Sequence, residues 1–207
     1  DRAVVVVTDA GTPGISDPGE VLVRAAIEHG HTVSAVPGPS AEVMALVISG
    51  LATARYVFDG FLPRSGSERT ARLRDASTER RTVVLYEAPH RLARTLEDLR
   101  ASCGGERVVV LARELTKIHE EVWRGTLAQA GEHVVAREPQ GEYVIVLEGA
   151  PATPDASDDD IRHGLAERLA SGVTRRTAVA DVADRFDVAR NRVYKIALAD
   201  AARQRPS

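Results

Sequence analysis

The sequence is poor in several residue types, and each shortage excludes a class of protein. Its one cysteine, Cys103, cannot form an internal disulfide or a multi-cysteine zinc site. No apolar run approaches the roughly 20 residues that cross a bilayer, and the first residues lack the charged, apolar and small-residue order of a secretory signal. His90 and His119 lie too far apart in the sequence for a recognised metal-ligand spacing. We therefore expect a cytoplasmic protein with no membrane segment and no metal.

Lysine is also scarce, and the charges are unevenly distributed. Of 27 basic side chains 25 are arginine, a bias that suits phosphate binding but is more simply explained by a GC-rich genome. The formal net charge is -3, yet residues 161–207 carry ten basic and five acidic side chains, whereas residues 1–160 carry 17 and 25. With 207 residues, of which 43% are hydrophobic and 28% charged, the chain is typical of a globular protein with a real core.

The first part of the chain alternates strand and helix signals. Residues 3–7 and 32–36 are short apolar, β-branched runs, which predict buried strands of a parallel sheet. A helix is predicted over 17–28 and another over 40–49, after the loop PGPSA. This β-loop-α-β-loop-α order predicts an α/β domain.

The second part repeats this alternation after a Gly, Pro and Ser cluster at residues 60–67. The predicted helices are 68–76 and 91–102, and the predicted strands are 82–86, 107–112, 121–124 and 142–147, in a mixed sheet. Residues 150–160 have the composition of a solvated linker, and three short helices follow over 160–171, 174–186 and 189–202. The last two resemble a helix-turn-helix pair weakly, and a small packing module is the simpler alternative.

We therefore expect an α/β protein in four parts. Residues 1–60 form the remainder of an N-terminal α/β domain, 61–150 a second α/β domain, 151–160 a linker and 161–207 a small helical module. Ligands of open α/β sheets bind at the carboxyl ends of the strands, where loops 9–13, 37–41 and 87–90 are predicted to meet. None of these loops matches a nucleotide phosphate-binding motif, so the residues alone predict only a ligand site.

Six segments carry a closer resemblance. They are TDAGTPGISDPG (8–19), PGPSA (37–41), GFLPR (60–64), YEAPHR (86–91), RELTKIHEE (113–121) and QGEYVIVLEG (140–149). In order and spacing they strongly resemble the ribosomal RNA small-subunit methyltransferase I family of the tetrapyrrole methylase superfamily. The similarity covers residues 1–149 almost continuously, and RELTK together with YEAPHR distinguishes this family from relatives that methylate corrin or porphyrin rings.

The resemblance implies a homodimer of two-domain chains that hold S-adenosylmethionine between the domains and 2'-O-methylate a cytidine of small-subunit ribosomal RNA. One departure is large, because the family's opening strand with its TPIGN-like motif and its AEDTR-like segment are absent from the sequence. The resemblance therefore implies a fragment with an incomplete first domain. Its alternatives are a small-molecule methylase of tetrapyrrole type and a non-catalytic RNA-binding fragment.

The matching motifs imply particular site residues. The implied cofactor contacts are Asp9, Gly11, Thr12, Pro13, Ile15, Ser40, Ala41, Tyr86, Leu115, Thr116 and Gly141. A ribose hydroxyl is a poor nucleophile, so a base or a cation must assist it. The candidates are Glu87, His90, Glu114, Lys117, His119 and Glu120, of which we select Lys117, Glu87 and Glu114 as catalytic. For Lys117, an ordinary surface ion pair with Glu114 or Glu120 is an equally good interpretation.

The RNA partner implies basic contacts. The expected ones are Arg64, Arg69, Arg72, His90, Arg91, Arg190, Arg192 and Lys195. The alternative for those near residue 70 is a solvated helix face, and for those of the C-terminal segment a packing module.

Overall fold

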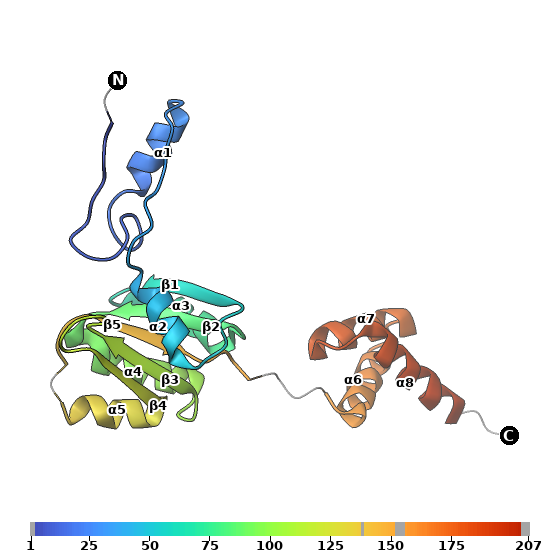
Figure 1. Ribbon diagram of the computed structural model, residues 1–207. Coiled ribbons are helices and arrows are strands. Elements are labelled where there is room, and N and C mark those ends of the chain that lie inside the picture. The colour runs from blue at the N-terminus through green and yellow to red at the C-terminus, as the bar shows by residue number, and fades with distance from the viewer. Residues whose placement is uncertain (1–2, 138, 152–155, 204–207) are drawn as a thin grey trace. The chain divides into compact units, whose positions relative to one another are not determined.

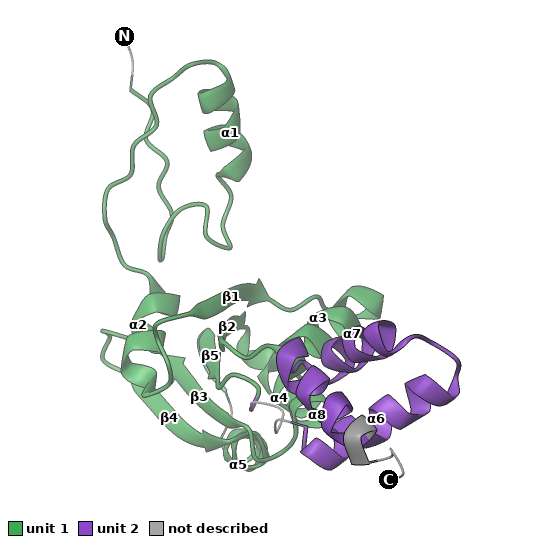
Figure 2. Ribbon diagram, turned by 90° about the vertical axis from the view of Figure 1, so that its right-hand side faces the viewer, with its two compact units in different colours: residues 1–150 green, residues 151–207 purple. Residues whose placement is uncertain are grey.

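The computed structural model describes residues 3–137, 139–151 and 156–203. The chain divides into two compact units, residues 1–150 and 151–207, which Figure 2 shows in green and purple. The predicted boundary at residue 60 falls inside a strand of the first unit rather than between two domains. Among the described residues, no helix is long and apolar enough to cross a membrane.

The centre of unit 1 is a mixed five-stranded sheet (Figure 1). Its strands are β1 (Tyr56–Phe61), β2 (Thr82–Glu87), β3 (Val108–Arg113), β4 (Glu121–Thr126) and β5 (Tyr143–Leu147), in the order β1-β2-β5-β3-β4. β1 and β2 are parallel, and β5 lies antiparallel between β2 and β3. The predicted α/β class with a mixed sheet is confirmed, although the prediction had no strand at β1.

Alternate side chains of each strand pack into two cores. Val83 and Leu85 of β2 face one core together with three helices, α3 (Gly66–Thr78), α4 (Pro89–Cys103) and α5 (Leu127–Val135). Val84 faces the other core, where Ala45 and Leu46 of α2 (Ala41–Ser49) pack on the sheet. This alternation follows from the two-residue period of a strand and sets which motif residues share a face.

The two predicted N-terminal strands are absent from the structure. Residues 3–7 and 32–36 form no strand, and the region contains only α1 (Glu20–Glu28), which has no buried residue. Val4, Val5 and Val7 are about 80% exposed, at 81%, 79% and 81%. A strand exists only through hydrogen bonds to a neighbour, and all strands of the described residues lie within 56–147. The prediction was wrong because a β-branched pattern indicates the strand propensity of a segment but not whether a neighbouring strand is present to pair with it.

The described residues of unit 2 form three helices, α6 (Asp158–Ala170), α7 (Arg175–Phe186) and α8 (Arg190–Arg203). They pack around Ile161, Leu165, Val182 and Val193, each at most 3% exposed. Thr174 caps α7 by accepting a hydrogen bond from the Thr177 amide, and Asp187 between α7 and α8 adopts a left-handed conformation. The predicted helices agree with these bounds to within two residues. The predicted linker falls partly on residues 152–155, outside the described residues.

Candidate functional site

One edge of the sheet gathers four of the six motif segments. In the ladder Phe61 pairs with Tyr86, and both Glu87 and Arg113 pair with Tyr143. The carboxyl ends of β1, β2 and β3 therefore lie beside the amino end of β5. The segments GFLPR, YEAPHR, RELTKIHEE and QGEYVIVLEG start or end at this edge. Of the three loops predicted to meet at strand ends, only 87–90 follows a strand, because residues 3–7 and 32–36 form none.

The loop after β3 holds the two charged residues closest to the predicted chemistry. The Lys117 Nζ lies 3.0 Å from a carboxylate oxygen of Glu114, with 63% and 28% of the side chains exposed. The Glu120 carboxylate accepts a hydrogen bond of 2.6 Å from the Thr116 amide, which braces the loop. Glu114 and Thr116 have φ of 51° and 66°. Such values are rare for residues other than glycine, particularly for a β-branched residue, and strained backbone of this kind clusters at functional sites.

The loop before β5 contacts the same carboxylate. A Cβ at Gly141, whose φ is +70°, would lie 3.2 Å from a Glu114 carboxylate oxygen. Arg113 fixes both loops, because its guanidinium donates to the Gln140 carbonyl at 3.2 Å and to the Glu121 carboxylate at 2.8 Å. The hydrogen bond from Arg113 holds the pKa of Glu121 below its usual value, against the opposing effect of burial. The structure thus brings Glu114, Lys117 and Gly141 together.

A buried carboxylate that the sequence analysis did not select connects α2 to this edge. Glu42 is 8% exposed and accepts hydrogen bonds from the Ser40 hydroxyl, at 2.6 Å, and from the Tyr86 hydroxyl. Burial raises the pKa of Glu42, but these two hydrogen bonds outweigh it, so the net pKa is lowered. Burial and the Glu42 carboxylate both raise the pKa of Tyr86. The signal in the sequence was a glutamate two residues after the serine of PGPSA.

The remaining two loops are joined by one hydrogen bond. The Thr12 hydroxyl donates to the Pro39 carbonyl at 2.8 Å, so TDAGTPGISDPG contacts PGPSA. The first loop is also held by a 2.6 Å hydrogen bond from Thr8 to Asp17. Thr12 is half-buried, whereas Asp9, Pro13 and Ile15 are exposed. Together with the contacts of Ser40 through Glu42, this hydrogen bond connects the predicted cofactor loops to the sheet edge.

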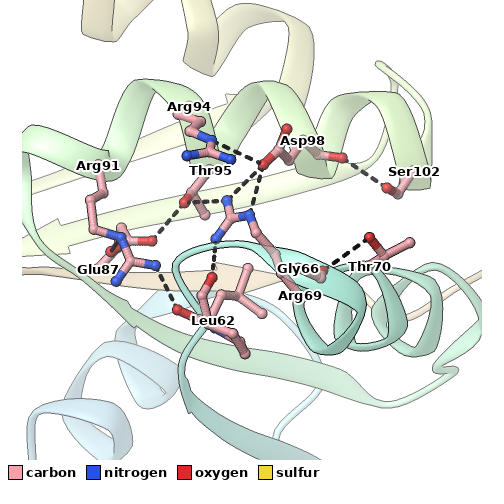
Figure 3. A network of polar contacts seen from close by, with 11 residues as sticks. Leu62, Gly66, Arg69, Thr70, Glu87, Arg91, Arg94, Thr95, Asp98 and Ser102 are labelled. Carbon is pink, nitrogen blue, oxygen red and sulfur yellow. Dashed lines mark hydrogen bonds and ion pairs between the residues drawn. The ribbon is translucent and has the colours of Figure 1, made fainter.

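Glu87 lies on the other face of the sheet from Tyr86, in the network of Figure 3. It is fully buried and accepts hydrogen bonds from the Thr95 hydroxyl at 2.6 Å and the Ala88 amide at 2.9 Å. The Arg91 guanidinium lies 3.2 Å from the same carboxylate. These three structural contacts and the full burial of Glu87 argue against its predicted catalytic role.

Three of the predicted RNA contacts are occupied by structural partners as well. Arg69 is 4% exposed and donates to Asp98, Thr95 and the Pro63 carbonyl (Figure 3). Because a buried guanidinium cannot reach a phosphate, the structure argues against the predicted RNA contact of Arg69. Arg72 donates to Asp59 on β1, and Arg91 donates to the Leu62 carbonyl at 2.5 Å. Both are partly exposed and position the loop after β1.

The other predicted contacts are accessible to differing degrees. Arg64, His90 and Lys195 are exposed, as is His119. Arg190 lies 3.3 Å from Asp184, both largely exposed. Arg192 donates to the Ala156 carbonyl and to Asp158, both at 2.8 Å. Ala41 and Leu115 are half-buried against the core formed by α2 and the sheet. Among the described residues, no three His, Cys, Asp or Glu side chains gather in a way that could hold a metal ion.

Comparisons with known proteins show which family the chain resembles. The family of Tetrapyrrole (Corrin/Porphyrin) Methylases matches residues 1–131. The chain is 44% identical over 197 residues to a ribosomal RNA small subunit methyltransferase I of Synechocystis sp., covering 94% of this chain and 71% of the relative. It is 45% identical to the protein of the same name from Mycobacterium tuberculosis, covering 87% of this chain and 62% of the relative.

A solved structure has a similar fold over part of the chain. The methyltransferase CobJ superposes with a TM-score of 0.53 at 22% identity, covering 68% of this chain and 62% of that one. At this identity the likeness supports the fold alone.

Proposed function

The chain belongs to the tetrapyrrole methylases and, among them, to the ribosomal RNA small subunit methyltransferase I family, and on this premise we propose that it 2'-O-methylates a cytidine of small-subunit ribosomal RNA with S-adenosylmethionine. The chain spans 62% of the Mycobacterium relative and 71% of the Synechocystis relative. The observation that supports the activity is the convergence of the motif loops at one sheet edge, with Glu114, Lys117 and Gly141 in contact.

The loops at this edge fit the proposed cofactor. A Cβ at Gly11 or Gly14 would meet no atom within 4 Å, so a ligand can approach the backbone there closely. The carboxylates of Asp9, Glu42 and Glu114 suit a ligand that carries positive charge. The proposed contacts are Asp9, Gly11, Thr12, Pro13, Ile15, Ser40, Ala41, Tyr86, Leu115, Thr116 and Gly141. Bound S-adenosylmethionine would supply a methyl group on a sulfonium, with a neutral thioether as its leaving group.

The residues of the chain must orient the ribose hydroxyl and accept its proton as the oxygen–methyl bond forms. We assign the orientation to Lys117, whose ammonium can donate to the ribose oxygen and stabilise the charge that develops there. Glu114, 3.0 Å from Lys117 on the same strained loop, holds this ammonium and accepts the proton. Alignment of oxygen, methyl and sulfur contributes further, since positioning alone lowers such barriers by several kcal/mol.

The proposed RNA contacts are the exposed or partly exposed basic residues of both units. They are Arg64, Arg72, His90, Arg91, Arg190, Arg192 and Lys195. Family membership also supports the proposals that the protein acts in the cytoplasm and as a homodimer. Analytical ultracentrifugation with and without the cofactor tests the dimer.

The decisive experiment supplies small ribosomal subunits that lack the modification and S-adenosylmethionine with a labelled methyl group. Label in the RNA at a ribose hydroxyl supports the proposal, whereas label only in an added porphyrin precursor would establish the small-molecule alternative. Calorimetry with S-adenosylmethionine tests the non-catalytic alternative. If the chain is only an RNA-binding fragment, it should not bind the cofactor.

Lys117→Ala tests the assignment of the loop. We expect methyl transfer to fall at least 100-fold, the scale typical of a lost acid-base or electrostatic group, with cofactor affinity within about threefold of the parent chain. Glu132→Ala, a change at an exposed residue of α5, is the matched control. Unchanged turnover of Lys117→Ala would show that its pair with Glu114 is an ordinary surface ion pair.

A further inference from the structure

Unit 2 contains a hollow lined by residues from the first two turns of α7 and of α8. Its volume is about 460 Å³, and its lining comprises Arg175, Arg176, Val179, Ala180, Arg190 and Tyr194. The spacing explains this grouping, because residues four apart lie on one helix face, as do 175 and 179, 176 and 180, and 190 and 194. The lining thus combines guanidinium groups with the small apolar side chains of Val179 and Ala180 and with Tyr194, which is 49% exposed.

Two of the three arginines that line the hollow, Arg175 and Arg176, differ from the other described arginines of unit 2. Five arginines pair with carboxylates: Arg162 with Asp159, Arg168 with Asp181, Arg185 with Glu167, Arg190 with Asp184 and Arg192 with Asp158. Arg175 and Arg176 are exposed and make no hydrogen bond or ion pair within the part of the chain that the structure describes. The Arg190–Asp184 pair is long, at 3.3 Å, and exposed, so it is weak. Positive charge is therefore available at this hollow.

The chemistry of the lining selects the ligand. Guanidinium groups bind phosphate oxygens through paired N–H donors, and the amino end of α7 adds its positive partial charge. A bare phosphate would leave the tyrosine ring and the apolar floor of Val179 and Ala180 without a partner. A nucleotide satisfies both, since its base or sugar can stack on Tyr194 while its phosphate meets Arg175 and Arg176.

The state of α8 favours single-stranded RNA over duplex DNA. A helix-turn-helix protein reads duplex DNA with free side chains at the start of its second helix. Here Arg192 of that helix is engaged by Asp158 and by the Ala156 carbonyl, and Asp158 brings an acidic cluster, Asp158–Asp160, close to it. We propose that the hollow between the first turns of α7 and α8 binds a nucleotide of single-stranded RNA, with Arg175 and Arg176 on the phosphate and Tyr194 on the base. This inference rests on the proposed function for its partner, ribosomal RNA.

The test uses the full chain and a fluorescein-labelled single-stranded RNA octamer of mixed sequence, with binding followed by fluorescence anisotropy. Arg175→Gln with Arg176→Gln is expected to weaken binding at least 20-fold. It should also lower the slope of log affinity against log salt by about 1.4, since each lost phosphate contact of a single strand accounts for roughly 0.7. Tyr194→Leu should weaken binding about tenfold with the slope unchanged, and Tyr194→Phe should restore it.

The charge-matched control is Arg162→Gln with Arg185→Gln, whose side chains lie outside the hollow. Equal losses in this control and in the Arg175/Arg176 variant would overturn the inference, as would equal affinity for a DNA duplex of the same sequence. Circular dichroism melts confirm that each variant remains folded, and Tyr194→Phe is a second variant that preserves the packing.

The outcome is separable from that of the proposed function. If the parent chain methylates small subunits while the Arg175/Arg176 variant binds the octamer normally, the inference fails and the function stands. If the parent chain transfers no methyl group but the variant loses RNA affinity, the function fails and the hollow remains an RNA site. If both hold, the variant should raise the KM for small subunits and leave the affinity for S-adenosylmethionine unchanged.

Discussion

Replacing Arg69 by alanine removes the centre of a buried polar network that holds α3, α4 and the loop after β1 together. The guanidinium makes two hydrogen bonds to Asp98, at 2.9 and 2.7 Å, one to the Pro63 carbonyl at 2.8 Å and one to the Thr95 hydroxyl at 3.0 Å. Figure 3 shows these contacts converging on one side chain. Arg94, which also pairs with Asp98, lies 3.9 Å from it and is largely exposed, so it replaces Arg69 poorly.

The expected loss of stability depends on how deeply Arg69 and Asp98 are each buried. Removing one partner of a buried pair costs about 3–5 kcal/mol, because the other charge is left without its partner. The Arg69 side chain is 5% exposed, but the Asp98 side chain is 32% exposed and can be rehydrated. We therefore expect the low end of the range, a loss of about 3 kcal/mol in the free energy of unfolding of unit 1. Lysine at this position restores the positive charge but not the planar guanidinium with its several N–H donors. Arg69→Lys should therefore recover only a minor part of the lost stability.

The measurement is a urea titration followed by the fluorescence of Trp123, the single tryptophan, which lies on β4 stacked on His133 and so reports on unit 1. With a slope of about 2 kcal/mol per molar urea, a loss of 3 kcal/mol lowers the midpoint by about 1.5 M. Arg64→Ala, at an exposed arginine of the same loop, should shift it by less than about 0.3 M. A shift below 0.5 M for Arg69→Ala would mean that the network is worth no more than a surface ion pair.

Three further predictions concern stability and the site. Hydrogen bonds from Arg81 lower the pKa of Glu79 to about 2 from its usual 4.5, so Glu79 stabilises the fold above pH 4.5 and this contribution is lost as the pH falls towards 2. Glu79→Gln should therefore destabilise the chain at pH 7 and not at pH 2, in urea titrations, and equal effects at both would contradict this. Gly149→Ala places a Cβ 2.0 Å from the Arg80 carbonyl oxygen and should cost at least 2 kcal/mol, whereas an unchanged urea midpoint would refute the close approach. Gly141→Ala forces a side chain into a φ of +70°, which should cost about 1 kcal/mol and lower methyl transfer at least tenfold; parent-like turnover would argue against a role for this loop.

Much of the second half of unit 1 was predictable from the sequence because its local signals and its tertiary partners agree. β2 and α4 match the predicted strand and helix to within two residues, since an apolar strand is followed by Pro89 at the start of a helix. α5 was missed although Thr126 and Gln129 form a capping box, a pattern that is visible in the sequence. β1 was missed because Asp59 and Gly60 interrupt its apolar pattern.

The candidate site was predictable as a set of loops but not as a set of contacts. The sequence predicted that loops 9–13, 37–41 and 87–90 would meet at strand ends, but only 87–90 follows a strand. The ladder around Tyr143 instead brings the ends of β2 and β3 together through β5. The hydrogen bond between Glu42 and Tyr86 joins residues 44 positions apart, and no local pattern encodes it. Arg69 was predicted to contact RNA because the resemblance implied an RNA partner, yet its burial depends on how α3 packs on α4.

The two carboxylates predicted to be catalytic, Glu87 and Glu114, differ in accessibility. The face of the sheet to which a strand residue points decides this more than its place in a motif. Glu87 follows Val83 and Leu85 at two-residue spacing, so its side chain joins the core under α4, where it is fully buried and hydrogen-bonded. Glu114 lies just beyond β3, where the chain leaves the ladder, and its side chain keeps 28% exposure and a lysine partner. A fully buried carboxylate that is held by three structural donors is not accessible to a substrate, whereas one on an exposed loop is. Accessibility therefore favours Glu114 over Glu87 as the proposed proton acceptor, even though both lie at the same sheet edge.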